Sequence, residues 1–420
     1  MEMGELEVYR AAFTPAEAAI VKELEAIQVV DCHEHLPPEA ERVAGEVDAL
    51  TLFSHYCRGD LGALVRDKTV VDFIYDSRQP FGPRWAAFKP FYESMKFTSY
   101  ARAAHITMQK FYGFSELSDE NCDQINAAMK AANKPGLYAK VLREACNIKT
   151  CLTQNGKTEF TDDGLLSHVL WCPGGSGGLS WDAVRADFGG SAGAAALELD
   201  DLVQGAKAHV DYAKKSGAVG MKFFVFNFKG ANRAAAEETL DYLKAHPAES
   251  VPPTNALQDY LMSAIFTHLG ECGLVCCLHT GYWGDYRTLN PSFALPIVQS
   301  HPNTNFDIYH VGYPYVREAI MLGKANHNVW LNMCWTYIIS QKFGFDALDE
   351  ILEMVPVSKI LGFGGDYFVI EKVYGHLIMA RETIAKVLAK KISEGYMTYD
   401  QAIMIAQMML RTNAEKLYGV

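Results

Sequence analysis

Eight short apolar runs, separated by segments with helical spacing, constrain the fold of this chain more than any other feature of its sequence. The runs span residues 29–36, 148–152, 168–172, 218–225, 273–279, 305–310, 329–335 and 360–366. Continuous apolar runs between helices are typical of parallel strands that are buried on both faces. Eight such units predict an α/β fold, a (β/α)8 TIM barrel. The alternative, a doubly wound open sheet, lacks its usual nucleotide-binding cues, because no GxGxxG follows the first run and no GxxxxGK[ST] occurs.

The spacing of the runs also predicts how the chain is organised around the barrel. We expect one barrel domain over residues 1–420, with a helical insertion at 37–147 after the first strand, where aromatic and charged residues recur at helical spacing. A Gly/Ser/Ala-rich stretch at 174–196 predicts a loop. Residues 373–418 have the spacing of helices throughout and predict a C-terminal helical segment.

Composition excludes several classes of partner. The net charge is −12 and no stretch gathers Lys and Arg into a stripe, so we expect no nucleic-acid partner. No apolar run approaches the roughly 20 residues needed to cross a bilayer, so we expect no membrane association. The ten cysteines include no CxxC pair, which indicates reduced, buried thiols. We therefore predict a cytoplasmic enzyme with a small-molecule substrate, and a homo-oligomer, since barrels of this size commonly associate.

Polar residues that follow the predicted strands indicate where the chemistry lies. His33 and His35 end the first strand and point the same way, since side chains alternate along a strand. His279 ends the fifth strand, His310 the sixth and Asp366 the eighth. Catalytic groups of a barrel lie at the carboxyl ends of its strands, so these five should meet on one rim.

Each of these residues also has a structural interpretation. A single histidine at a strand end is usually capped or half-exposed, and Gly364-Gly365-Asp366 also fits an ordinary turn. What favours a metal site is that several weak signals fall at equivalent strand ends. Neutral imidazoles and one carboxylate hold a divalent ion with a position left open for water, and a carboxylate there accepts the proton of that water. His310 could then polarise a carbonyl or protonate a leaving group. The remaining histidines, His55 and His376 among them, are expected to be structural.

With these motifs the chain resembles the amidohydrolase superfamily of metal-dependent barrels, particularly its amidohydrolase-2 branch near the uronate isomerases. The resemblance extends over most of the chain. It rests on His33-Glu34-His35, Leu278-His279-Thr280-Gly281, Tyr309-His310-Val311-Gly312-Tyr313-Pro314, Gly364-Gly365-Asp366, the run 328–332 and a closing helix that ends at 413–417.

The resemblance implies a role for each motif residue. His33, His35, His279 and Asp366 would ligate one or two divalent ions, zinc or else manganese, and His310 would act beside them. Some members of the superfamily bridge two ions with a carboxylated lysine from the fourth strand. Lys222 lies in the middle of that strand, so bridging, substrate binding and simple packing all remain open.

Residues near the same rim are candidates for binding the substrate, namely Lys222, Tyr282, Trp283, Arg317 and Trp335. Uronate isomerases use an arginine and a tryptophan around an acidic sugar, parts that Arg317 and Trp335 could play. Aromatic residues at the starts of loops also pack on helices, and Arg317 also fits a surface ion pair.

The predicted function is metal-dependent hydrolysis of a C–N or C–O bond, in an amide, lactone or ester of a small polar or carboxylated molecule. The alternative on the same barrel is an isomerase of the uronate or aldose type, or a non-oxidative decarboxylase. A non-catalytic barrel is disfavoured, because every position of the ligand set is filled.

Overall fold

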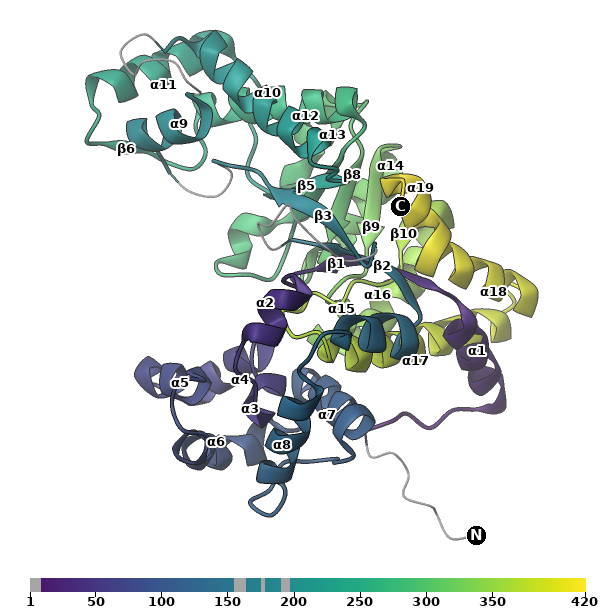
Figure 1. Cartoon of the computed structure of the whole chain (residues 1–420). Helices are drawn as coiled ribbons and strands as arrows, with labels where there is room; N and C mark the ends of the chain where they lie inside the picture. Colours follow the sequence, from purple (N-terminus) through teal and green to yellow (C-terminus); the bar gives the residue numbers. More distant parts are fainter. Residues whose placement is uncertain (1–8, 155–163, 175–177, 190–196) are drawn as a thin grey trace.

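The computed structural model describes residues 9–154, 164–174, 178–189 and 197–420, and it contains the predicted barrel (Figure 1). Eight parallel strands form one sheet in the order β1-β2-β3-β5-β7-β8-β9-β10. All eight predicted strands are confirmed. Their bounds are Val29–Glu34 (β1), Ile148–Thr153 (β2), Leu166–Trp171 (β3), Gly220–Phe224 (β5), Val275–His279 (β7), Phe306–Tyr309 (β8), Val329–Asn332 (β9) and Ile360–Leu361 (β10).

The barrel closes through the residues that follow β10, a strand of only two residues. The backbone N–H of Cys32 donates to the carbonyl of Phe363 at 3.0 Å, and the N–H of Asp366 donates to the carbonyl of His33 at 2.8 Å. These bonds join the last segment of the sheet to the first. Because of this seam, Asp366 lies directly beside the end of β1.

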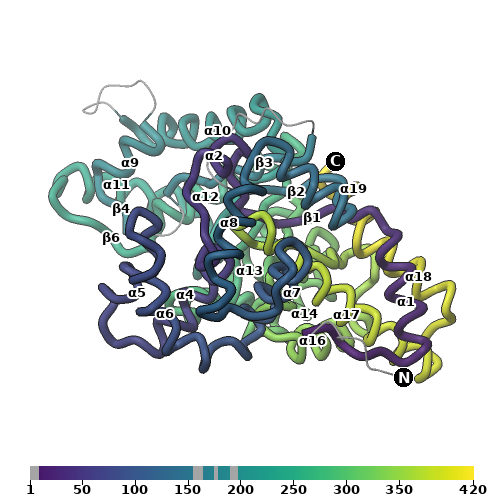
Figure 2. The backbone as a smooth tube through the Cα atoms, turned by 60° about the horizontal axis from the view of Figure 1, so that its bottom comes forward, coloured from purple at the N-terminus to yellow at the C-terminus, as the bar shows by residue number. Residues whose placement is uncertain are grey.

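The helical insertion after β1 is confirmed, and it forms a lobe with its own apolar core. Its helices, which we call the insertion lobe, lie at lower left in Figure 1 and come forward in Figure 2. They are α2 (Glu39–Ala44), α3 (Ala49–Leu52), α4 (Tyr56–Leu64), α5 (Lys68–Tyr75), α6 (Phe81–Met95), α7 (Ser99–Tyr112) and α8 (Cys122–Ala132), followed by a π-helix, η1 (Ala139–Ala145).

A second lobe projects at upper left in Figure 1. It contains α9 (Trp181–Phe188), α10 (Leu199–Lys215), α11 (Arg233–Ala245) and an antiparallel pair of short strands, β4 (Leu179–Ser180) and β6 (Ser250–Val251). The loop predicted for 174–196 is therefore wrong at 179–188. The Ser180 hydroxyl accepts from the backbone N–H of Ala183 and caps α9, whose apolar side chains are buried. Residues 175–177 and 190–196 of that stretch lie outside the described residues.

The remaining helices surround the sheet, and the predicted C-terminal helical segment is confirmed. α17 packs against α1, α7 and α16. Thr14 and Glu17 begin α1 with a capping box, with Pro15 in its first turn. The bounds are α1 (Pro15–Ala26), α12 (Ala256–Cys272), α13 (Ala294–Ser300), α14 (Val316–Ala325), α15 (Thr336–Ile339), α16 (Gln341–Met354), α17 (Lys372–Ser393), α18 (Tyr399–Gln407), the π-helix η7 (Met408–Thr412) and α19 (Asn413–Tyr418).

Two expectations from composition can be compared with the structure. All ten cysteines are free, and nine of them are buried. Among the helices of the described residues, none combines the length and the apolar character needed to span a membrane.

A buried carboxyl group lies inside the barrel, where α19 packs against β1 and β10. Asp307 on β8 accepts a hydrogen bond from the Tyr418 hydroxyl at 2.5 Å and one from the Asn332 amide at 2.8 Å. Burial raises the pKa of Asp307 from 3.8 to about 7, although both hydrogen bonds oppose the rise. The folded protein therefore holds this proton over a pH range in which the unfolded chain has lost it.

Asp307→Asn is expected to remove a pH dependence of stability. Between pH 4 and 7 the folded state binds more protons at Asp307 than the unfolded state, so the contribution of Asp307 to the free energy of unfolding falls as pH rises through this range. The variant, which resembles the protonated acid, should gain up to about 4 kcal/mol relative to the wild type from pH 4 to pH 7. Urea unfolding of both proteins at several pH values measures this difference, and a constant difference would contradict the prediction.

Candidate active site

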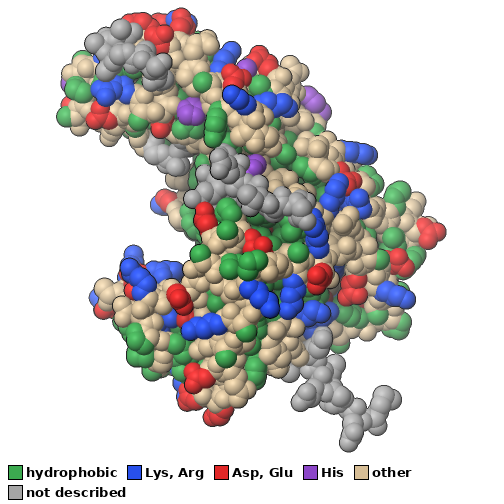
Figure 3. All heavy atoms as spheres, in the orientation of Figure 1, with side chains coloured by type: hydrophobic (Ala, Val, Ile, Leu, Met, Phe, Trp, Pro, Cys, Tyr) green, Lys and Arg blue, Asp and Glu red, His purple; other side chains and the backbone are tan. Residues whose placement is uncertain are grey.

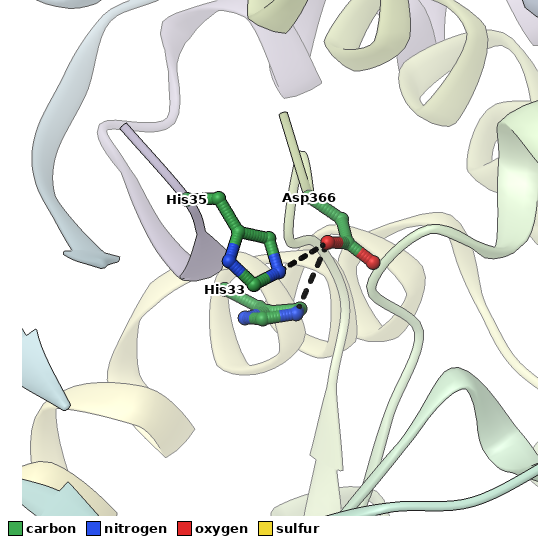
Figure 4. Close-up of side chains that lie close together, drawn as sticks. All are labelled: His33, His35 and Asp366. Carbon is green, nitrogen blue, oxygen red and sulfur yellow. Dashed lines mark ion pairs between the residues drawn. The ribbon is translucent and has the colours of Figure 1, made fainter. Parts of the chain in front are cut away.

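Two imidazole rings and a carboxylate meet where β1 ends. His33 is the fifth residue of β1 and His35 follows the strand, so both rings point to the same side. Asp366 Oδ1 lies 3.2 Å from His33 Nε2 and 3.1 Å from His35 Nε2 (Figure 4). One ligand atom from each of the three residues lies within 4.8 Å of the others. His33, His35 and Asp366, three of the four residues predicted as metal ligands, thus lie together.

The protonation of this cluster fits a bound cation. His35 Nδ1 lies 2.9 Å from the carbonyl of Gln154, an acceptor, so Nδ1 carries the hydrogen and donates it. In the neutral ring Nε2 then has a lone pair, which faces a carboxylate oxygen. Asp366 Oδ1 has no hydrogen-bond partner among the described residues, despite the two short distances. Two lone-pair atoms at this separation repel each other unless a positive ion lies between them.

Electrostatics give the groups the charges that metal ligands need. Burial lowers the pKa of His33 well below its usual value, and it lowers the pKa of His279 likewise, so both rings are neutral at pH 7. Burial would raise the pKa of Asp366, but the nearby His33 and His35 rings hold it well below its usual value. His33 and His279 are therefore neutral at pH 7, beside an ionised Asp366.

His279 and His310 lie beside the cluster rather than within it. His279 is the last residue of β7, and its Nδ1 lies 3.2 Å from His310 Nε2, while its own Nε2 is buried with no partner among the described residues. His310 begins a short 3-10 turn, η5 (His310–Gly312), and its Nδ1 lies 3.8 Å from Asp366 Oδ2. His310 thus links the carboxylate to His279. Burial lowers the pKa of His310 to about 3, so this ring is neutral as well.

Lys222 reaches the same cavity from the middle of β5. Its side chain is 1% exposed and its Nζ has no hydrogen-bond partner among the described residues. The ammonium lies 3.8 Å from the centroid of the Tyr309 ring, a cation–π contact. Burial lowers the pKa of Lys222 to about 8, with Asp366 opposing the shift, so the cation persists at pH 7 without a paired anion.

A cavity of about 520 Å³ opens over these groups. Figure 3 shows the surface of the molecule indented at left, between the insertion lobe and the second lobe. His33, His35, Asp366, Lys222 and His279 line the cavity. Aromatic rings supply most of the remaining wall, from Tyr56, Trp171, Phe224, Trp283, Trp335 and Phe368.

The structure separates the predicted substrate-binding residues into two groups. Trp283 and Trp335 line the cavity, and Tyr282 stacks on Trp335 with ring centroids 5.6 Å apart. Arg317 lies outside it on the surface, where its Nε is 3.0 Å from a carboxylate oxygen of Glu350. Arg317 lies on α14 with its side chain in solvent, so its position does not support the predicted contact with a substrate in the cavity.

Sequence reasoning missed several residues of the cavity wall. His55 was expected to be structural, yet it lines the cavity together with Tyr56. Both come from the insertion lobe, and no strand-end pattern could have located them. Gln154 and Trp171, by contrast, lie at or just after the ends of β2 and β3, and the rule that found His279 could have found them.

The backbone around Asp366 is held to β1 by consecutive hydrogen bonds. The N–H of Gly365 donates to Asp31 Oδ1 at 3.1 Å, and the N–H of Tyr367 donates to Glu34 Oε2 at 2.6 Å. The N–H of Asp366 itself also donates to β1, across the seam. Asp366 has a φ of +60°, a left-handed conformation that is unusual for an aspartate. Glu34 thus fixes the backbone next to Asp366.

The fold and this site define a barrel enzyme of the amidohydrolase superfamily. A family model for amidohydrolases matches residues 179–420, and the chain belongs to that family. Members are generally metal-dependent, in agreement with the donor set described above. The chain is also 29% identical over 145 residues, or 34% of its length, to Protein fluG of Emericella nidulans. The matched part is 17% of that relative, so the chain spans about a sixth of its length.

Solved structures with the same fold include enzymes of two kinds. The uronate isomerase of Thermotoga maritima superposes with a TM-score of 0.77 at 13% identity, covering 100% of both chains. A protein of Lactobacillus casei described as a metal-dependent hydrolase has a TM-score of 0.63 at 17% identity, covering 95% of this chain and 97% of its own. At these identities the likeness concerns the fold, and the reaction must be argued from the site.

Proposed function

We propose that this protein is a metal-dependent hydrolase that cleaves a C–N or C–O bond, in an amide, lactone or ester of a small carboxylated molecule. The observation that carries the proposal is the pair of imidazole nitrogens facing one carboxylate oxygen, with an unpaired lysine in the same cavity. The imidazoles and the carboxylate would hold the ion, and the lysine would bind the substrate.

His33, His35 and Asp366 would hold a divalent ion, with His279 completing the set. Zinc suits imidazole and carboxylate donors, and manganese is the alternative. When bound, such an ion supplies acidified water and polarises the oxygen of the scissile bond. Two ions would require a bridging group, and Lys222 is the residue of the cavity placed on the strand that provides one in the superfamily.

The protein's own groups divide the remaining tasks. Asp366 presents Oδ1 to the two imidazoles and turns Oδ2 toward His310, so the second oxygen is free to accept a proton. His310 Nδ1 lies 3.3 Å from the carbonyl of Cys334 and would donate its hydrogen to it, so His310 would position Asp366 and His279, and the proton held on Asp366 would pass to the leaving group directly. Trp283, Trp335 and Phe224 would exclude water from the reacting bond.

The substrate's carboxylate would pair with Lys222, since a buried ammonium without a partner is costly. Lys222 is the only Lys or Arg among the described residues that line the cavity. Arg317, the arginine considered for an acidic sugar, lies on the surface, and no other arginine is among the described residues that line the cavity. This favours hydrolysis over isomerisation of a uronate or aldose, the second candidate, and non-oxidative decarboxylation is the other alternative on the same barrel.

Reaction in H₂¹⁸O separates these candidates. The probes are succinamic acid and N-phenylsuccinamic acid. In both compounds two carbon atoms separate a free carboxylate from the amide. Hydrolysis splits each amide and leaves one ¹⁸O atom in the succinate product. A panel of uronates and aromatic acids tests the other reactions. Conversion of a uronate to an isomer, or loss of CO₂, with no cleavage of any amide, lactone or ester would refute the proposal.

Removing the metal is expected to abolish hydrolysis of N-phenylsuccinamic acid and to lower Tm. A ligand that binds only the folded state stabilises it by about 4 kcal/mol at 1,000 times its Kd. Dialysis against dipicolinate followed by differential scanning calorimetry, before and after adding Zn²⁺ or Mn²⁺, measures both effects. His35→Ala should show no Tm shift on adding metal. Full activity of metal-free protein would contradict the prediction.

A further inference from the structure

A second cavity, of about 930 Å³, adjoins the one over the metal cluster. Phe224 and Trp283 line both cavities, so the two meet at these rings. The same rings flank His279, with centroids 4.8 and 6.3 Å from the imidazole. Phe224 and Trp283 thus form a wall common to both cavities, directly beside His279.

The size of the two cavities together argues against a substrate as small as a monosaccharide. Pockets that bury most of a drug-sized ligand commonly measure about 300–1,000 Å³, and each of these two cavities lies within that range. The substrate therefore has room for two parts, one on each side of Phe224 and Trp283.

The walls of the second cavity are largely apolar, and their charges cancel. Phe226, Leu289 and Phe293 contribute apolar surface. The charged residues of the lining, Asp285 and Arg287, neutralise each other through two contacts of 2.7 Å. A charged group of a ligand would therefore meet no unpaired opposite charge among the described lining residues of the second cavity. In the first cavity, by contrast, the Lys222 ammonium has no paired anion among the described residues.

One polar group in this wall lacks a partner. Gln258 on α12 lines the second cavity, is 1% exposed, and donates from Nε2 to the carbonyl of Gly174 at 3.4 Å. Its Oε1 is buried and accepts no hydrogen bond from the described residues. A buried acceptor without a donor is unfavourable, so an N–H or O–H group of a ligand would be stabilised at this position.

We propose that the second cavity is a subsite for the leaving half of the substrate, an apolar group of aromatic size that carries an N–H or O–H donor. The inference rests on the proposed hydrolase function. The acid half would lie at Lys222 and the metal cluster, and the scissile bond would lie beside His279. The substrate class is then an amide or ester formed by one carboxyl group of a small dicarboxylic acid with an aromatic or similarly bulky amine or alcohol, so that the second carboxylate remains free for Lys222. Hydrolysis releases the acid into the first cavity and the amine or alcohol into the second.

Direct binding tests the subsite without catalysis. The probe is 2-naphthylamine, followed by isothermal titration calorimetry. Thr254 is exposed, precedes α12 and lines the second cavity, so Thr254→Trp fills the space without disturbing the core. Thr267→Trp, on the exposed side of the same helix and away from both cavities, is the matched control. Binding of 2-naphthylamine should weaken at least about tenfold in Thr254→Trp, and likewise in Thr288→Trp, because Thr288 also lines the second cavity. It should remain unchanged in Thr267→Trp.

The acceptor is tested by comparing two ligands of similar shape. Gln258→Met removes the oxygen and keeps the length of the side chain. It should weaken 2-naphthylamine by about three- to tenfold, the effect of one hydrogen bond, and leave 2-methylnaphthalene unchanged. No binding of 2-naphthylamine to the wild type, or equal binding to Thr254→Trp, overturns the proposed subsite, as does equal loss of both ligands in Gln258→Met.

Kinetics then connect the subsite to the reaction. For the wild type, kcat/KM for N-(2-naphthyl)succinamic acid should exceed that for succinamic acid by at least about tenfold. Thr254→Trp should remove this advantage, whereas Thr267→Trp should keep the wild-type kcat/KM for both amides. Equal kcat/KM for the two amides would overturn the subsite and leave the hydrolase proposal intact. Binding of 2-naphthylamine without cleavage of any amide or ester would overturn the hydrolase proposal and leave a binding site for the apolar group.

Discussion

Asp366→Asn is expected to lower kcat/KM for N-(2-naphthyl)succinamic acid by about 10²–10⁴-fold, the range attributed to a positioned acid–base group. The substitution keeps the size of the side chain, but an amide carries no negative charge and cannot accept the proton as a carboxylate does. Both tasks assigned to Asp366, at Oδ1 toward the imidazoles and at Oδ2 toward His310, are lost together. Steady-state kinetics measure the effect on activity.

The same variant should lose bound metal, which elemental analysis after gel filtration detects. Asp72→Asn is the matched control, because this aspartate is exposed and pairs with Arg58 on the insertion lobe. It should retain the activity and metal content of the wild type. An Asp366→Asn protein with full activity and a full complement of metal would remove Asp366 from the site.

Gly365→Ala is expected to damage both stability and the metal site. A Cβ atom at this position would overlap the carboxyl group of Glu34, which accepts from the N–H of Tyr367. Overpacking of a close contact typically costs about 1–3 kcal/mol in the free energy of unfolding. Moving Glu34 or the backbone also displaces Asp366, and loss of such support commonly lowers metal affinity by about 10–100-fold.

Urea unfolding and a metal-competition titration measure these two effects separately. Gly62→Ala on α4 is the control, because a Cβ there meets nothing within 4 Å. In a helix this change should be neutral or stabilise the protein slightly, by roughly 0.5–1 kcal/mol. If the free energy of unfolding and the zinc affinity of Gly365→Ala equalled those of the wild type, the contact with Glu34 would not be what positions Asp366.

The strands and the central cluster could be predicted because their signals are local. An apolar run that stops at His33 or His279 indicates a buried strand and its polar end in a few consecutive residues. The geometry of a barrel then brings such ends together, whatever the sequence between them. His310 and Asp366 were found by the same rule, although His279 and His310 lie beside the cluster of His33, His35 and Asp366 and not within it.

The residues that were missed or misplaced depend on contacts between distant segments. His55 reaches the cavity because the whole insertion lobe folds back over the barrel, and nothing near it in the sequence indicates that. Arg317 was a candidate through its position after His310, but helix α14 turns its side chain to solvent. The second cavity is bounded by three separate loops and by Gln258 on α12, so its existence follows from tertiary packing alone.

The seam that carries Asp366 has a consequence for how the protein folds. Gly365 and Asp31, which meet across it, are 334 residues apart in the sequence. Contacts of such separation form slowly, because the entropy of closing a long loop must be overcome first. Until residue 366 has been synthesised, β1 presents an unpaired edge, a known site of pairing with other chains. We expect a chain that is truncated before β10 to aggregate during expression, since the segment that completes the catalytic cluster also protects the first strand.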